Sequence, residues 1–120
     1  MDISRLEEDL VSEIKLEPLQ AKVYLLVNCS GKMSPDIMAE KLGISTKSAL
    51  DAAQKLMDLG AFIDMPGDEF EAMHPRFTAV NMYRRYCIQH DIKFKQNKIV
   101  DNIGAALESA YDVARTGSQS

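Results

Sequence analysis

The 120-residue chain contains no tryptophan, and its only cysteines are Cys29 and Cys87. Neither cysteine has a closely spaced partner, so the sequence offers neither a disulfide framework nor a pattern of zinc ligands. No apolar run approaches the roughly 20 residues that a membrane-spanning helix needs. The first ten residues are acidic and amphipathic, unlike a signal peptide. We therefore expect a cytoplasmic protein with reduced thiols and no contact with a membrane.

Sequence signatures of catalysis are missing as well. The chain has no glycine-rich phosphate loop, no paired carboxylates in a recognisable frame and no nucleophile motif. Cys87 and His90 stand about one helical turn apart, next to Asp91, but a metal site needs further ligands. A buried thiol and a surface histidine are the simpler interpretation. The sequence predicts no enzyme, no cofactor and no metal site.

Basic residues are outnumbered by acidic ones, 14 to 18, but they are concentrated in one part of the chain. The net charge is −4, which argues mildly against a nucleic-acid partner. Residues 1–71 carry 14 acidic and 7 basic side chains, whereas residues 72–100 carry six basic side chains and one acidic side chain. Such asymmetry can present a basic face to a polyanion. Alternatively, the two parts neutralise each other within the monomer or across a dimer.

The stretch from Ser34 to Leu59 predicts two helices joined by a tight turn. Ser34 and Pro35 are typical of a helix start, and Gly43 is typical of a left-handed helix end. After a cap at Ser45, apolar residues recur at helical spacing: Ala49, Ala52, Ala53, Leu56 and Leu59. This is the helix-turn-helix arrangement, whose second helix enters the major groove of DNA. The alternative is an ordinary helical hairpin of a bundle.

The pattern changes from helical to strand-like after Gly60. Residues 61–65 are short and apolar, residues 66–68 read Pro-Gly-Asp, and residues 69–73 alternate between polar and apolar. The candidate inward-facing residues are Phe62, Ile63, Phe70 and Met73. A two-stranded hairpin directly after a recognition helix is a wing. We therefore expect a mainly α fold of the winged helix-turn-helix class with a two-stranded β-hairpin wing.

Helices are also predicted over residues 2–15, 16–29, 77–89 and 92–115. In the last of these, a heptad pattern aligns six apolar residues on one seam: Ile92, Ile99, Ile103, Ala106, Ala110 and Val113. About 24 helical residues span roughly 36 Å, more than a small core covers, so we expect this helix to contact its copy in a homodimer. The alternative is that it folds back on the first helix. The expected divisions are a winged helix-turn-helix domain over 1–90, a dimerisation helix over 91–115 and a disordered tail over 116–120.

Several stretches carry a family resemblance. They are QAKVYL at residues 20–25, IMAEKLGI at residues 37–44, the end of the second helix at residues 56–60, the hairpin, and Pro75. Together they resemble the N-terminal domain of the TrmB-like archaeal transcription regulators, and these motifs are shared with MarR-like and other winged regulators. The resemblance covers roughly residues 14–90 and implies a DNA-binding regulator.

The chain departs from this family in three places. Glu17 stands where the family usually has a capping threonine, and Ala49-Leu50 replaces a tyrosine that is usual inside the recognition helix. Three acidic residues, Asp64, Asp68 and Glu69, surround the tip of the wing. Members whose wing contacts phosphate carry arginine or lysine there. The wing therefore either stays off the DNA or serves another partner.

The sequence thus predicts a homodimeric, sequence-specific transcriptional regulator that binds double-stranded DNA through a recognition helix over about residues 45–59. The expected DNA contacts are Ser45, Thr46, Lys47, Ser48, Asp51, Gln54, Lys55, Arg84 and Arg85. Arg84 and Arg85 could equally pair with an acidic N-terminal helix. The alternative function is a winged-helix module that does not bind DNA and docks on another protein, which the acidic wing and the net charge favour.

Overall fold

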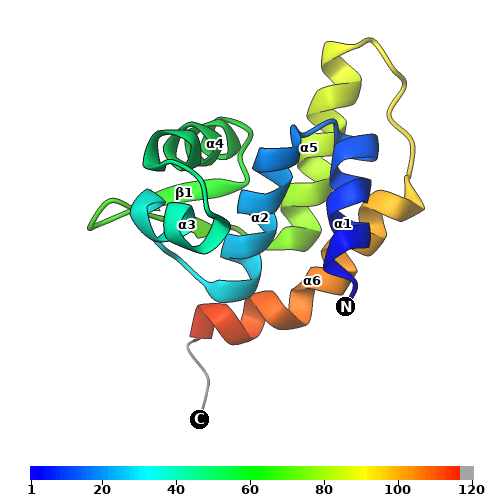
Figure 1. The fold of residues 1–120 in the computed structure, drawn as a ribbon. Coiled ribbons are helices and arrows are strands. Elements are labelled where there is room, and N and C mark those ends of the chain that lie inside the picture. Colours follow the sequence, from blue (N-terminus) through cyan, green and yellow to red (C-terminus); the bar gives the residue numbers. More distant parts are fainter. Residues whose placement is uncertain (117–120) are drawn as a thin grey trace.

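The computed structural model describes residues 1–116 and consists mainly of helices with one antiparallel hairpin (Figure 1). The first part comprises α1 (Ile3–Asp9), a π-helical turn η1 (Leu10–Ile14), α2 (Pro18–Ser30), α3 (Pro35–Leu42) and α4 (Thr46–Asp58). The second part comprises β1 (Phe62–Met65), β2 (Glu69–Ala72), α5 (Pro75–Gln89) and α6 (Lys98–Thr116). Within residues 1–116, no helix combines the length and apolar character that crossing a bilayer requires.

The two helices predicted between Ser34 and Leu59 are confirmed, together with their caps. The Ser34 hydroxyl accepts a hydrogen bond from the Ile37 N–H at 3.3 Å, and the Ser45 hydroxyl accepts one from the Ser48 N–H at 3.0 Å. Gly43 ends α3 with a φ of 68°, a left-handed conformation that glycine adopts without strain. The three-residue turn that follows sets α4 against both α3 and α2.

The predicted hairpin is also confirmed. Its register pairs Phe62 with Ala72 and Met65 with Glu69, and Met33 extends the sheet by one bridge to Phe70. Phe62 and Phe70 are buried as expected. Ile63 and Met73 are 40% and 44% exposed, so the expectation that they face inward is wrong. Successive strand side chains alternate between faces, and burying Phe62 therefore turns Ile63 outward.

The C-terminal helix begins at Lys98, six residues later than the sequence pattern predicts. The Asn97 side-chain oxygen accepts hydrogen bonds from the backbone N–H groups of Ile99 (3.0 Å) and Val100 (3.2 Å), as an N-cap does. Residues 92–97 form an irregular connection between α5 and α6, drawn in yellow at one edge of the molecule (Figure 1). Ile92 therefore lies outside the helix on whose seam it was expected.

Helix α6 belongs to the same core as the rest of the chain. It packs on α5 and α2 with five buried residues: Val100, Ile103, Gly104, Leu107 and Tyr111. The boundary expected at residue 90 therefore does not separate two packing units. Ile103 has no exposed surface, so its side chain cannot reach a second copy without unfolding. Thr116 is still helical, and residues 117–120 of the expected tail lie outside the described residues.

Polar groups inside this core are few. The hydroxyls of Tyr24 on α2 and Thr78 on α5 are 2.7 Å apart and share a hydrogen bond. Complete burial raises the pKa of the Tyr24 phenol above its ordinary value, so this group is neutral and free to donate or accept. A third buried polar residue, Asn28, donates to the Tyr24 carbonyl at 2.8 Å. The Asn28 bond lies within α2, whereas the bond between Tyr24 and Thr78 ties α2 to α5. Both α4 and α6 pack against α2.

Candidate nucleic-acid interface

The outer face of α4 is the surface that the sequence predicts to contact DNA. Its inner face is buried through Ala49, Ala52, Ala53 and Leu56. The predicted contact residues of this helix all lie on the other side: Ser45, Thr46, Lys47, Asp51, Gln54 and Lys55 are exposed, and Ser48 is half-buried. The structure therefore leaves these seven residues outside the core-facing stripe of α4, with Thr46 and Gln54 toward the hairpin and Lys55 toward α5.

Two contacts order the first turns of this face. The Thr46 hydroxyl donates to an Asp36 carboxylate oxygen on α3 at 3.0 Å, which ties the two helices together. Lys47 Nζ lies 3.2 Å from an Asp51 carboxylate oxygen, with the two side chains 83% and 60% exposed. Exposed ion pairs of this kind contribute little to stability. Lys47 can therefore exchange Asp51 for a phosphate at low cost.

Arg84 and Arg85 are neighbours in sequence but face different surroundings. The Arg85 guanidinium donates to the Asp58 carbonyl at the end of α4 at 3.2 Å and lines the same hollow as Lys55. The Arg84 guanidinium lies over the Phe94 ring, 4.4 Å from its centroid. The structure thus brings Arg85 next to α4 and leaves Arg84 apart from it. Neither arginine forms an ion pair with the acidic residues of α1 in the described part of the chain.

A groove of about 420 Å³ lies between α4 and the hairpin. We call it the acidic groove, because its lining includes four carboxylates and no basic side chain: Asp36, Asp64, Asp68 and Glu69. Leu50, Met57, Met65 and Phe70 supply its apolar surface. Carboxylates repel phosphates, so the hairpin side of α4 disfavours a DNA backbone.

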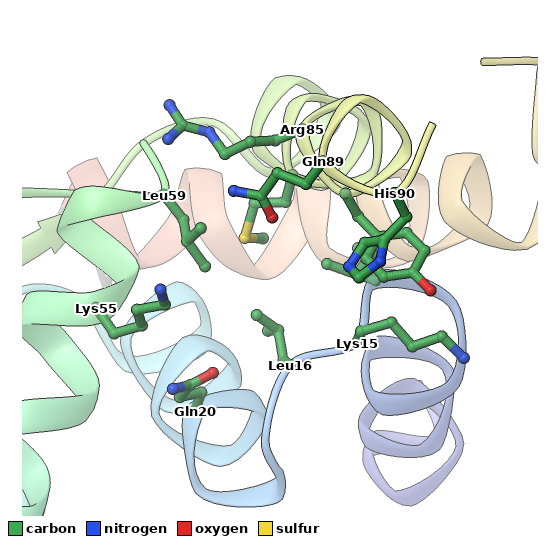
Figure 2. A pocket seen from close by; sticks show the side chains of 11 residues that line it. Lys15, Leu16, Gln20, Lys55, Leu59, Arg85, Gln89 and His90 are labelled. Carbon is green, nitrogen blue, oxygen red and sulfur yellow. The ribbon is translucent and has the colours of Figure 1, made fainter. Parts of the chain in front are cut away.

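A second hollow, of about 190 Å³, lies on the opposite side of α4, against α5 and the η1–α2 junction (Figure 2). We call it the basic pocket, because its lining contains Lys15, Lys55 and Arg85 and no carboxylate. The sequence did not indicate this pocket, since its residues come from four separate segments. The basic stretch at residues 84–85 was the only visible signal.

The thiols and histidines do not form a recognisable site. Cys87 is completely buried, and the His90 ring lies tilted against the Tyr86 ring with centroids 4.4 Å apart. Partial burial raises the pKa of the Cys29 thiol above its ordinary value, so this group is less reactive than a free thiol. Residues 1–116 hold no group of three or more His, Cys, Asp or Glu side chains placed to bind a metal.

Comparison with known proteins adds no family to this picture. No protein-family model, no curated protein and no solved structure matches the chain. The TrmB-like resemblance therefore rests on the short stretches of sequence alone, and membership of that family stays a prediction.

Proposed function

We propose that the chain is a winged helix-turn-helix protein that binds double-stranded DNA with α4 as its recognition helix and acts as a transcriptional regulator. The observation that supports this proposal is the order α3, three-residue turn, α4 and hairpin, with the outer face of α4 left uncovered (Figure 1). The hydroxyl, amide and amino groups on this face suit base edges and phosphates. The N-terminal end of α4 adds the positive end of a helix dipole.

Electrostatics set the expected strength of binding. Residues 34–73, which hold α3, α4 and the hairpin, carry eight acidic and three basic side chains. Non-specific affinity depends mainly on neutralised phosphates. The basic side chains placed to neutralise phosphates are Lys47 and Lys55 on α4 and Arg85 beside this helix. We therefore expect weak non-specific binding in which the hairpin takes no part.

The direct test is the fluorescence anisotropy of a labelled duplex titrated with the unmodified protein. We expect a non-specific dissociation constant of about 10⁻⁴ to 10⁻⁶ M at physiological salt, and tighter binding at lower salt. Binding that is absent at low salt and micromolar protein, for duplexes of mixed sequence, would contradict the proposal.

The acids of the hairpin give a more specific expectation. Reversing Asp68 and Glu69 to lysine should tighten non-specific DNA binding, because the hairpin tip would then attract phosphates. Each new phosphate contact should steepen the slope of log affinity against log salt by about 0.9. The control is Glu8→Lys, which reverses an exposed acid on α1. An unchanged slope in the hairpin variant would mean that the hairpin lies out of reach of the duplex.

A homodimer is part of the proposal, because two copies read half-sites about 34 Å apart. Part of the apolar seam of α6 is buried in the monomer. The large apolar side chains of the seam that a second copy could contact are Ile99 and Val113, which are 44% and 53% exposed. They lie four turns apart on one side of the helix, separated by about 21 Å. Ala106 and Ala110 are half-buried between them. An Ile99→Glu/Val113→Glu variant should be monomeric by light scattering, and an unchanged dimer would locate the interface elsewhere.

The acidic groove favours a second candidate function, a module that docks on another protein. Four carboxylates around an apolar surface complement a basic, amphipathic segment of a partner. A lysine-rich amphipathic peptide should then perturb the NMR signals of the Leu50 and Met57 side chains. This function becomes the preferred one when the peptide binds and duplex DNA does not.

A further inference from the structure

The acidic groove between α4 and the hairpin carries charge that the fold leaves uncompensated. Asp64, Asp68 and Glu69 line its hairpin side, and none of them forms an ion pair in the part of the chain that the structure describes. Leu50 and Met57 add apolar surface from α4. The volume of about 420 Å³ falls in the range of about 300–1,000 Å³ that small ligands fill, so the groove takes a few side chains of a partner. The occupant that this lining favours has apolar side chains with cations beside them.

The opposite side of the molecule carries a surface of that kind. Figure 1 shows the hairpin at one edge of the molecule and the end of α5, with the yellow connection to α6, at the other. Ile88 and Ile92 are 72% and 46% exposed there. Lys93 and Lys95 follow them in the chain, are exposed, and form no ion pair among the described residues. We call this surface, residues 88–95, the basic tip.

Backbone hydrogen bonds hold the basic tip in one shape. Asp91, its one acidic residue, has a left-handed φ of 54°, and its N–H donates to the Ile88 carbonyl at 3.3 Å. The Ile92 N–H donates to the Cys87 carbonyl at 2.8 Å, which completes the hydrogen-bond pattern of a left-handed helix end. The Phe94 ring lies against two side chains of α5 and anchors the chain between the two lysines. A surface that is ordered before contact loses less entropy on binding.

We infer that the basic tip of one copy docks in the acidic groove of a second copy. Lys93 and Lys95 pair with the carboxylates of Asp64 and Glu69, and the exposed isoleucines of the tip cover the apolar surface of the groove. This inference rests on the docking function proposed for the acidic groove and names the partner. It does not depend on DNA binding by α4.

The positions of the two surfaces determine the kind of assembly. The groove and the tip face away from each other across the molecule, so one copy cannot join its own two surfaces (Figure 1). Each head-to-tail contact leaves a free groove at one end and a free tip at the other. Such a contact adds further copies, whereas a two-fold contact through α6 stops at a dimer.

The test is static light scattering of the full chain at low salt over rising protein concentration. A dimer through α6 alone gives a mass that levels off at two copies, and the head-to-tail contact makes the mass rise further. Because a small contact rich in charge is weak, we expect this growth at protein concentrations of about 10⁻⁵ to 10⁻³ M. Raising the ionic strength to about 1 M, where the Debye length is about 3 Å, should reverse most of it.

Charge reversals connect the growth to the two surfaces. Asp64→Lys/Glu69→Lys and Lys93→Glu/Lys95→Glu should each stop the growth. Combining all four substitutions in one chain swaps the charges and should restore it at the original net charge of −4. The groove variant alone has a net charge of zero, which by itself promotes association. Loss of growth in that variant is therefore opposite to the effect of net charge.

The matched control for the tip variant is Lys32→Glu/Lys41→Glu. It makes the same change in charge at exposed positions outside the groove and the tip, and it should keep the growth. Asp64, Lys93 and Lys95 are exposed, so circular dichroism should report an unchanged fold. If the groove variant does not fold, the tip variant and its control decide the test.

Three results would overturn the inference. The first is a mass that never exceeds two copies up to a protein concentration on the order of 10⁻³ M. The second is growth that persists in the tip variant or is lost equally in its control. The third is a folded chain with all four substitutions that does not regain the growth. A lysine-rich peptide that binds the groove of a chain without such growth would leave the docking function in place and exclude a second copy as its partner.

Discussion

Replacing Gly104 by alanine is expected to lower the free energy of unfolding by about 2 kcal/mol. Gly104 lies where α6 crosses the start of α5, and a Cβ atom there would stand 2.7 Å from Arg76 Cα and 3.0 Å from the Pro75 carbonyl oxygen. Both are backbone atoms, so the two helices themselves would have to separate. Because α6 supplies part of the core, this separation would also expose buried apolar surface.

The expected loss of stability is opposite in sign to the usual effect of replacing glycine by alanine in a helix. Alanine in place of glycine in a helix normally stabilises it by about 1 kcal/mol. Thermal denaturation should instead show a Tm about 8 °C lower. The control is Ser109→Ala on the exposed side of α6, which should change stability by less than about 0.5 kcal/mol. A Gly104→Ala variant as stable as the unmodified protein would mean that α5 and α6 are not in this close contact.

Replacing Lys47 and Lys55 together by alanine is expected to remove most of the non-specific affinity for DNA. The two lysines are the only basic side chains on α4, and both are exposed. Loss of two phosphate contacts should flatten the slope of log affinity against log salt by up to about 1.8. Neither side chain belongs to the apolar stripe, and stability should change by no more than about 0.5 kcal/mol per site.

The matched control for this pair is Lys41→Ala/Lys98→Ala. It removes the same charge from α3 and α6, and both positions are exposed. Anisotropy titrations at several salt concentrations would compare the two double variants. If the slope of log affinity against log salt flattened equally in both double variants, net charge alone, and not the face of α4, would determine binding.

The central helix pair and the hairpin could be predicted from the sequence because local signals determine them. Caps at Ser34 and Ser45, the glycine at 43 and the Pro-Gly-Asp turn act over a few residues. The start of α6 had such a signal too, since Asn97 is a typical N-cap. The apolar heptad pattern extends through residues 92–97, and the helix was therefore expected to begin before this cap.

The surroundings of the site could not be predicted in the same way. Which of Arg84 and Arg85 lies beside α4 depends on how α5 is rotated in the fold, and two adjacent arginines look alike in sequence. The basic pocket joins residues from Ile14 to His90, so no local sequence pattern indicates it. Whether the apolar seam of α6 packs within the monomer or against a second copy depends on which of the two offers the larger apolar surface.

Contact between the outer face of α4 and duplex DNA can be tested by an NMR titration of the isotope-labelled chain with a mixed-sequence duplex at low salt. We expect the largest shifts of backbone amide signals between residues 45 and 55, with smaller changes at the hairpin tip over residues 67–69. Signals that stay unchanged at excess duplex, or changes confined to helices other than α4, would show that α4 is not the DNA-binding element.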